Sequence, residues 1–369
     1  MMKVLILSEG NSPHTIKWVN ALSNRGIKIH LISLTSFGSS KYSKSQNLTF
    51  EYMNISGELT NKTDGSYAKI SYLKTIRRIR ESIKIFKPDI LHSHYASSYG
   101  LLGALINFHP FIISAWGSDI YNFPRKSLLH KLLLQYNLKN ADAILSTSKA
   151  MAVEISRYVK AKIHITPFGI DLEKFKPKKI KKPFDDESIV IGTVKTLEAH
   201  YGIEYLIHAF YLLKNRINNK NLRLLIVGTG SQEKYLKRLC MELNIQKDVQ
   251  FTGFIDNKVI QDYHNMLDIA VYPSLNESFG VAVLESCACE KPVVVSDCPG
   301  FKEVVEDGKT GIIVPRKNTI KFVAAIEHLV TNEEMRMQLG ENGRKMVERF
   351  YSLDDSVDKM MKIYNLFYH

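Results

Sequence analysis

Short apolar runs alternate with amphipathic helical patterns along the chain. Runs of four to seven apolar residues predict buried strands, and the intervening segments, with apolar positions every third or fourth residue, predict helices. This alternation predicts parallel sheets that are covered by helices on both faces. In the first half the predicted strands are 4–7, 27–33, 48–52, 90–92, 111–114, 143–146 and 163–166, and the predicted helices are 14–24, 67–86, 97–106, 127–140 and 149–158.

The alternation is interrupted once. Residues 171–187 carry Pro177, Pro183 and six lysines, a composition typical of a linker. After the linker, strands are predicted at 189–194, 222–227, 249–252, 269–272 and 292–296, and helices at 203–216, 232–243, 257–265, 281–289, 317–331, 333–350 and 353–367. We therefore predict two doubly wound α/β domains, at 1–170 and 188–350, and a separate last segment, 351–369.

Length and composition agree with two soluble domains. The chain has 369 residues, 45% of them hydrophobic and 24% charged, and no apolar run is long enough for a membrane-spanning helix. The apolar start is too short for a signal peptide, so we expect a cytoplasmic protein. Four cysteines without metal-ligand spacing favour reduced structural thiols.

The net positive charge of the chain comes from its first half. Residues 1–183 contain 28 Lys and Arg against 11 Asp and Glu, whereas residues 184–369 contain 22 against 26. This asymmetry predicts that the first half faces an anionic membrane surface, and the alternative is a general contribution to solubility. No nucleic-acid-binding motif accompanies the charge, so nucleic acid is not an expected partner.

In the second half, the strongest candidate site is the segment from Glu277 to Glu285. It follows the strand at 269–272 and places one carboxylate in a loop and the other on the following helix. Ser278 and Gly280 are small enough for backbone N–H groups to approach an anion at the helix N-terminus. Glu285 lies among apolar residues, where a carboxylate needs a partner. The two acids suit the two ends of an extended ligand, and the alternative is a capping charge plus a surface residue.

Other candidates follow neighbouring strands. Lys195 ends the strand at 189–194 and is placed to bind phosphate oxygens, with His200 close behind it. Gly230 belongs to a Gly-Thr-Gly turn that lacks the third glycine of a dinucleotide fingerprint, and Phe254 offers an apolar face for a base.

In the first half, two polar loops follow strands and open helices. One contains Gly10, Asn11, Ser12 and His14, and the other contains Trp116, Gly117 and Asp119, whose carboxylate could be a helix cap instead. His92 and His94 lack a third ligand at a suitable spacing, so we interpret them as loop or core residues, not as a metal pair.

Four segments together resemble the retaining glycosyltransferases of family 4. They are the Glu277–Glu285 segment, the GTVKTLEAHYG loop that contains Lys195, PFGIDLEKFKP at the linker and DGKTGIIVP near residue 310. The resemblance covers nearly the whole chain. It implies the GT-B architecture, in which two Rossmann-like domains face a central cleft, and a last helix that returns to the first domain.

The resemblance also implies roles for individual residues. Glu285 corresponds to the acid that holds the ribose hydroxyls, and Glu277 to the acid that contacts the transferred sugar. The backbone of residues 278–281, Ser278 to Val281, is expected to bind the sugar and the diphosphate. The basic pair of the family corresponds to Thr193 and Tyr201, so Lys195 and His200 are the candidates that replace it.

The first domain departs from the family pattern as well. Its first loop has Asn11, Ser12 and Pro13 in place of a glycine pair, although Gly10, Asn11 and Ser12 remain expected donor ligands. Trp116 occupies the position of a histidine that many members carry, and His14 is the alternative candidate for that role. We expect His14, Trp116 and Gly117 to bind the acceptor, and we expect Asp119 to join Glu277 and Lys195 in catalysis.

The implied reaction transfers a sugar, with retention, from a nucleotide diphosphate sugar to a saccharide or a polyprenyl-diphosphate-linked acceptor in cell-surface polysaccharide biosynthesis. No cofactor and no metal are expected, because Lys195 and N–H groups neutralise the diphosphate and no Asp-x-Asp signature is present. The protein would act as a peripheral protein at the inner face of the membrane. A GT-B-fold sugar-nucleotide epimerase and a catalytically inactive partner protein remain as alternatives.

Overall fold

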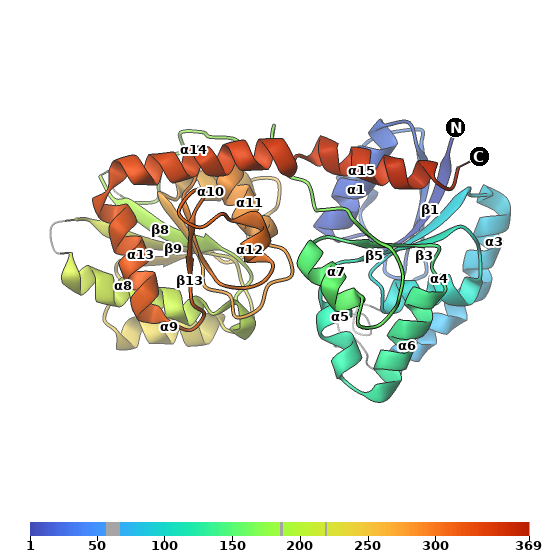
Figure 1. Cartoon of the computed structure of the whole chain (residues 1–369), viewed down its shortest axis with the longest axis horizontal. Coiled ribbons are helices and arrows are strands. Elements are labelled where there is room, and N and C mark those ends of the chain that lie inside the picture. The colour runs from blue at the N-terminus through green and yellow to red at the C-terminus, as the bar shows by residue number, and fades with distance from the viewer. Residues whose placement is uncertain (57–66, 185–186, 218–219, 369) are drawn as a thin grey trace. The chain divides into compact units, whose positions relative to one another are not determined.

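The computed structural model describes residues 1–56, 67–184, 187–217 and 220–368. The chain divides into two compact units, Met1–Phe168 with Leu353–His369, and Gly169–Ser352. Each unit is an open, fully parallel sheet with helices on both faces (Figure 1). The predicted fold class, two Rossmann-like doubly wound α/β domains, is confirmed.

The first unit is built on a seven-stranded sheet. Its strands are β1 (Lys3–Leu7), β2 (Lys28–Ser33), β3 (Leu48–Tyr52), β4 (Ile90–His94), β5 (Phe111–Ala115), β6 (Ala143–Ser146) and β7 (Ile163–Ile165). Their order is β3-β2-β1-β4-β5-β6-β7, with Leu7 paired to Ser93 between β1 and β4. The strand order reverses between β1 and β4, and ligands of such sheets bind beyond the carboxyl ends of the strands at this point.

Helices cover both faces of this sheet. They are α1 (Pro13–Asn24), α3 (Ile76–Phe86), α4 (Ser98–Ile106), α5 (Ser118–Tyr121), α6 (Leu128–Lys139), α7 (Lys149–Ile155) and α15 (Leu353–Asn365), with the 3-10 helices η1 (Ser39–Lys41), η2 (Tyr67–Thr75) and η3 (Phe123–Arg125). The single helix predicted at 67–86 is confirmed from Ile76 to Phe86 as α3 and is wrong before it, where η2 lies. The sequence of η2, YAKISYLKT, mixes polar and apolar residues without separating an apolar face from a polar face.

The last helix, α15, belongs to the first unit, where it packs along α1 (Figure 1). Arg25, just after α1, forms ion pairs with Asp354 at 2.9 Å and with Asp358 at 2.7 Å. On its buried side, α15 carries Tyr364, whose hydroxyl lies 2.6 Å from Nδ1 of His92 in the sheet. These contacts attach the end of the chain to the core of the first unit.

The second unit is built on a six-stranded sheet in the order β10-β9-β8-β11-β12-β13. Its strands are β8 (Ile189–Val194), β9 (Leu222–Val227), β10 (Val249–Phe251), β11 (Ile269–Tyr272), β12 (Val293–Ser296) and β13 (Ile312–Val314). The strand order reverses between β8 and β11. β13 lies within the segment DGKTGIIVP and was not predicted as a strand, although β7 and β10, which are equally short, were.

The longer helices of the second unit match the predicted segments closely, whereas the short helices η4 and α12 were not predicted. They are η4 (Ala199–Tyr201), α8 (Ile203–Arg216), α9 (Glu233–Glu242), α10 (Ile260–Met266), α11 (Val281–Ala288), α12 (Phe301–Val304), α13 (Thr319–Thr331) and α14 (Glu333–Phe350). All four cysteines of the chain are buried and free, as predicted for structural thiols. Within the described residues, no helix has the length and apolarity to span a membrane.

Candidate functional site

The reversal point of the second sheet brings two of the predicted catalytic residues together. Lys195 follows β8 directly, and Glu277 lies in the loop after β11, the neighbouring strand. Their side chains form an ion pair with 2.6 Å between Nζ and Oε2. Only 14% of the Lys195 side chain and 10% of the Glu277 side chain is exposed. Two opposite charges therefore meet, largely out of water, at the position where a sheet of this topology binds ligands.

The surroundings of Lys195 keep its ammonium group charged. Its Nζ lies 4.2 Å from the centre of the Tyr201 ring, which adds a cation–π contact. Burial opposes the charge, but Glu277, Tyr201 and Glu285 outweigh burial and raise the pKa of Lys195. The site thus holds a permanently charged cation whose main counter-ion is a carboxylate.

Glu277 leads into the N-terminus of α11. Gly280, at the cap position, has a φ of 114°, a left-handed conformation that favours glycine. Gly300 lets a second loop approach, since a Cβ there would lie 2.6 Å from the carbonyl oxygen of Glu277 and from the amide nitrogen of Phe279. Phe279 is buried, so only its backbone can face a ligand. The first N–H groups of α11 have no partner within the helix and can serve an anion.

Glu285, on α11, is partly buried beside residues that the sequence analysis did not single out. His264 of α10 lies with Nε2 3.4 Å from a carboxylate oxygen of Glu285, and its Nδ1 is 2.8 Å from Oγ of Ser286. The charge of Glu285 also acts on Lys174, where it opposes the burial that lowers the pKa of Lys174. The sequence analysis treated Lys174 only as a linker charge. His264 was not a candidate because it does not lie in a loop that follows a strand.

The remaining predicted donor ligands of this unit are placed differently. His200 lies in η4, with its ring 4.0 Å from that of Tyr201, and its pKa is lowered by burial and then by Lys195. Gly230 packs against the carbonyl oxygen of Leu197. Phe254 is exposed and follows β10, two strands from the reversal point. His200 therefore belongs to the surroundings of Lys195, whereas Phe254 follows a strand that neighbours neither β8 nor β11.

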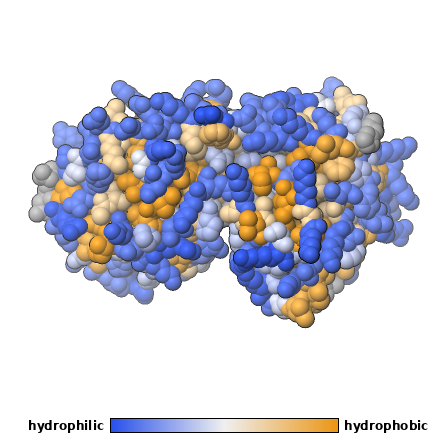
Figure 2. All heavy atoms as spheres, viewed as in Figure 1, coloured by the Kyte–Doolittle hydropathy of each residue, from blue (hydrophilic) through white to orange (hydrophobic). Residues whose placement is uncertain are grey.

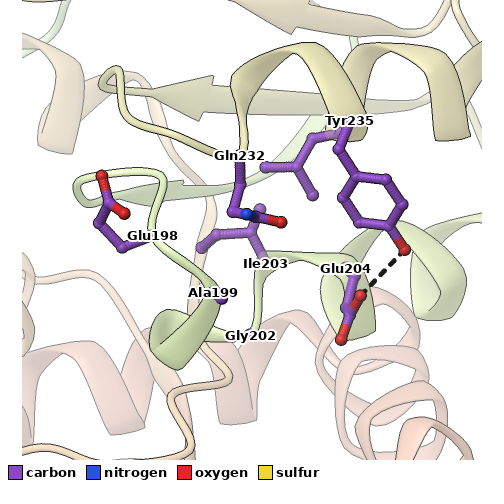
Figure 3. Close-up of a pocket in the computed structure, with 8 residues that line it drawn as sticks. Glu198, Ala199, Gly202, Ile203, Glu204, Gln232 and Tyr235 are labelled. Atoms are coloured by element: carbon purple, nitrogen blue, oxygen red, sulfur yellow. Dashed lines mark hydrogen bonds between the residues drawn. The ribbon is translucent and has the colours of Figure 1, made fainter.

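A small pocket lies between the starts of α8 and α9 (Figure 3). Its labelled residues come from the loop after β8 and from the two helices, and Tyr235 donates a hydrogen bond to Glu204 at 3.0 Å. Glu198 accepts hydrogen bonds from the amide and the hydroxyl of Ser231, which lower the pKa of Glu198. Two carboxylates at one pocket repel a diphosphate, so the pocket suits hydroxyl groups and not phosphates.

In the first unit, rings gather beyond the carboxyl ends of β1, β4 and β5. His14 stacks on Phe168 with 4.0 Å between ring centres, and Trp116 lies at 5.7 Å from His14 and 5.5 Å from Phe168. Below them His94 is tilted against Trp116 at 4.7 Å. The structure thus brings His14 and Trp116 together, and it adds Phe168, which the sequence analysis had noted only within a linker motif.

His92 and His94 are core residues, which confirms the sequence interpretation. His94 is fully buried, with Nδ1 at 3.1 Å from the hydroxyl of Ser8, and burial lowers the pKa of His94 to about 3. Burial and the neighbouring His94 also lower the pKa of His92 well below its usual value. Both rings are therefore neutral at physiological pH. Within the described part of the chain, no three His, Cys, Asp or Glu residues are grouped so that they could hold a metal ion.

Two further candidate residues, Asp119 and Gly10, make hydrogen bonds within the fold. Asp119 is fully buried, and its carboxylate accepts hydrogen bonds from the amides of Ala96 at 2.7 Å, Gly117 at 2.7 Å and Trp116 at 3.2 Å. Gly10 donates its amide to Ser33 and accepts a hydrogen bond from Tyr42 on its carbonyl oxygen. This geometry favours the capping alternative for Asp119, and it gives the Gly10 backbone a structural role.

The remaining predicted residues of the first unit are Asn11 and Ser12 of the first polar loop, and Gly117. The side-chain amide of Asn11 donates a hydrogen bond to the carbonyl oxygen of Ser36. Ser12 is the cap residue of α1, although its hydroxyl makes no capping hydrogen bond. Gly117, with a φ of 150°, begins α5 beside Trp116. These residues lie at the same edge of the first sheet as the ring cluster.

Comparisons with known proteins agree with this arrangement. Residues 174–346 match the family described as glycosyl transferases group 1, and residues 3–148 match the family described as glycosyl transferase 4-like. Two solved structures share the fold: sucrose-phosphate synthase from Thermosynechococcus elongatus (TM-score 0.84, 18% identity, 99% of each chain) and Anabaena HepE in complex with UDP and glucose (TM-score 0.77, 16% identity, 99% of this chain and 100% of that chain).

Relatives in sequence carry the same family name. The chain is 26% identical over 300 residues to an uncharacterized glycosyltransferase, MJ1178, of Methanocaldococcus jannaschii, with 80% of each chain covered. It is 27% identical over 205 residues to the capsular polysaccharide biosynthesis glycosyltransferase CapM of Staphylococcus aureus, covering 54% of this chain and 53% of the relative. These findings do not favour an epimerase. The chain belongs to the glycosyltransferases of the GT-B fold, with a 4-like first domain and a group 1 second domain.

Proposed function

We propose that the protein transfers a sugar from a nucleotide diphosphate sugar to a hydroxyl group, with retention of the anomeric configuration. The observation that carries this proposal is the buried Lys195–Glu277 ion pair beside the N-terminus of α11. The diphosphate leaving group develops negative charge as the glycosidic bond breaks. A fixed ammonium group and helix N–H groups stabilise that charge most effectively where water is scarce.

In this proposal the donor lies along the carboxyl edge of the second sheet. Its diphosphate contacts Lys195 and the backbone of residues 278–281, while Glu277 binds hydroxyls of the transferred sugar. Glu285, on the same helix, accepts hydrogen bonds from the ribose. Since Lys195 is paired with Glu277 before the donor arrives, the diphosphate takes over the ammonium group and frees the carboxylate for the sugar.

The chemical step balances without a cofactor. The bond from the anomeric carbon to the phosphate oxygen breaks, and a bond to the acceptor oxygen forms on the same face of the sugar. The acceptor proton moves to an oxygen of the departing diphosphate. Metal independence is part of the proposal, because Lys195 and the helix N–H groups supply the neutralising charge.

We propose that the acceptor binds at the carboxyl edge of the first sheet. His14, Trp116 and Phe168 offer ring faces on which a saccharide can stack. The relative CapM is named for capsular polysaccharide biosynthesis, and HepE binds UDP and glucose, which supports a saccharide or lipid-linked acceptor and a UDP-sugar donor. With the basic first half, this favours a peripheral protein at the inner membrane face in cell-surface polysaccharide biosynthesis.

Donor binding provides the direct test. Calorimetry with UDP-, GDP- and dTDP-sugars at up to millimolar concentration is expected to find one donor that binds. Lys195→Gln is expected to weaken that donor about 100-fold, since a buried charge–phosphate contact is lost. The matched control Lys321→Gln removes an exposed lysine of the same unit and is expected to leave affinity unchanged. Absence of binding by all three nucleotide classes would refute the proposal.

The stereochemistry is tested separately. The anomeric coupling constant of the product, measured by NMR on the nascent glycoside, is expected to match that of the donor. A product of opposite configuration would overturn retention and leave the donor assignment intact. Full transfer after removal of divalent metal by EDTA is expected, and its abolition would overturn metal independence.

A further inference from the structure

The helix α6 presents its apolar residues to the solvent. Leu128 is 70% exposed, Leu132 is 52% exposed, Leu129 is 48% exposed and Tyr136 is 42% exposed. At about 100° per residue, these four side chains fall within an arc of about 100° on the helix. The opposite side, which packs on the first unit, includes the polar residues His130 and Asn137. The buried side also carries Leu134 and Leu138, so α6 is apolar on both sides, whereas the outer face of a surface helix is usually polar.

Positive charge borders this apolar face. Lys131 lies beside it, Lys139 lies at its C-terminal end, and Arg125 and Lys126 precede the helix. No Asp or Glu occurs between residues 120 and 141. Arg125 is paired with Glu154 at 2.8 Å, whereas Lys126, Lys131 and Lys139 are exposed. The surface therefore combines an apolar strip with three exposed cations.

The apolar strip is visible on the molecular surface. Figure 2 shows hydrophobic atoms gathered at the lower tip of the first unit, where Figure 1 places the beginning of α6. The helix follows β5 by way of the short helices α5 and η3, so Leu128 and Leu129 stand at the end of α6 that is connected to the carboxyl edge of the sheet. That edge also carries Trp116, a residue of the proposed acceptor site.

We propose that this face of α6 inserts into the surface of an anionic lipid bilayer. The inference rests on the lipid-linked acceptor of the proposed function, because a bilayer contact near the acceptor edge would bring the enzyme to its substrate. Leucines and a tyrosine on one side of the helix, with lysines beside and at the end of this strip, form the composition of a helix that lies in the interface of a membrane. The cations add attraction to anionic headgroups.

The size of the strip favours a bilayer over a second copy of the chain. Stable protein interfaces bury about 800 Å² on each partner, with about 20–30 residues a side. Four exposed apolar side chains on three turns of one helix are far fewer. A bilayer requires no matching surface, and the cations would repel the same cations of a second copy across a symmetric contact.

Vesicle flotation with the full-length protein tests the proposal. The wild type is expected to bind phosphatidylcholine vesicles that contain 30% phosphatidylglycerol more strongly than pure phosphatidylcholine. The variant Leu128→Ser with Leu132→Ser is expected to lower the partition coefficient about tenfold or more at every salt concentration. The matched control, Ile320→Ser with Met337→Ser, removes two exposed apolar side chains of the second unit and is expected to float like the wild type.

A charge variant separates insertion from electrostatic attraction. Lys126→Gln with Lys131→Gln and Lys139→Gln is expected to lose the preference for anionic vesicles but to keep a residual binding that salt does not remove. Equal flotation of the leucine variant and the wild type would overturn the proposal. So would sedimentation analysis showing that the wild type is a dimer and that the leucine variant is a monomer with unchanged flotation.

Donor calorimetry on the same samples keeps the two proposals distinguishable. The leucine variant is expected to bind the donor with wild-type affinity, which also shows that it is folded. A wild type that floats but binds no sugar nucleotide contradicts the proposed function and not the bilayer contact. A wild type that binds the donor but does not float contradicts only the bilayer contact.

Discussion

Replacing Glu277 by glutamine tests the central ion pair. The change keeps the shape of the side chain and removes its charge, which leaves the ammonium group of Lys195 largely buried. At 2.6 Å and an effective dielectric constant of about 20, the attraction in the pair is about 6 kcal/mol. Desolvation offsets part of this, and removal of one partner of a buried pair costs about 3–5 kcal/mol.

We expect Glu277→Gln to lower the free energy of unfolding by about 3 kcal/mol, which is the lower end of this range. The amide oxygen can still accept a hydrogen bond, and Glu285 remains near Lys195. For a unit of this size the loss corresponds to a fall of about 6–12 °C in Tm.

Because the pKa of Lys195 is raised above 10.5, the stabilisation by the ion pair is fully present below pH 10.5 and is lost as the pH rises through the raised pKa.

The assay is a double-mutant cycle of Glu277→Gln and Lys195→Gln, in which the free energy of unfolding in urea and the turnover rate are both measured. The double variant is expected to lose about 2 kcal/mol less stability than the sum of the single variants, because it leaves no unpaired charge. Turnover is expected to fall about 100-fold or more in each single variant and to remain low in the double variant. Recovery of stability without recovery of turnover separates the structural role of the pair from its chemical role.

Two results would refute this reasoning. Additive effects of the two substitutions on stability, within about 0.5 kcal/mol, would mean that the pair is not coupled in the folded protein. Near-normal transfer by Glu277→Gln would mean that its carboxylate does not act on the sugar.

Three further predictions concern other parts of the two units. Asp119→Ala should lower the free energy of unfolding by about 3 kcal/mol, since three amides lose their acceptor in the core; an unchanged urea midpoint would contradict this. Because the pKa of His94 is lowered to about 3, the folded protein should lose about 2 kcal/mol between pH 8 and pH 5 through this residue, as the unfolded chain takes up the proton. His94→Gln should remove that part of the slope in urea titrations, and identical slopes would argue against it. Gly300→Ala should weaken donor binding about tenfold by displacing the backbone of Glu277 and Phe279, with Gly38→Ala as the control, and equal calorimetric affinities would exclude the displacement.

The apolar pattern alone determined most of the fold. Parallel strands buried on both faces are continuous apolar runs, so twelve of the thirteen strands among the described residues could be recognised from single segments. Two failures are local. η2 lacks an apolar face, and β13 was not separated from the segment DGKTGIIVP in which it lies. The fold class followed because the order of strands and helices restricts the possible topologies.

The chemistry of individual side chains depended on contacts that the sequence does not contain. Lys195 and Glu277 are 82 positions apart, and they meet because β8 and β11 are neighbours in the sheet. Asp119 fitted a catalytic role and a cap equally well until the amides of Ala96, Trp116 and Gly117 were seen around its carboxylate. An apolar run indicates a buried strand, and it can be recognised from the segment alone. The role of a charged side chain depends on groups that only the folded chain brings within a few ångströms of it.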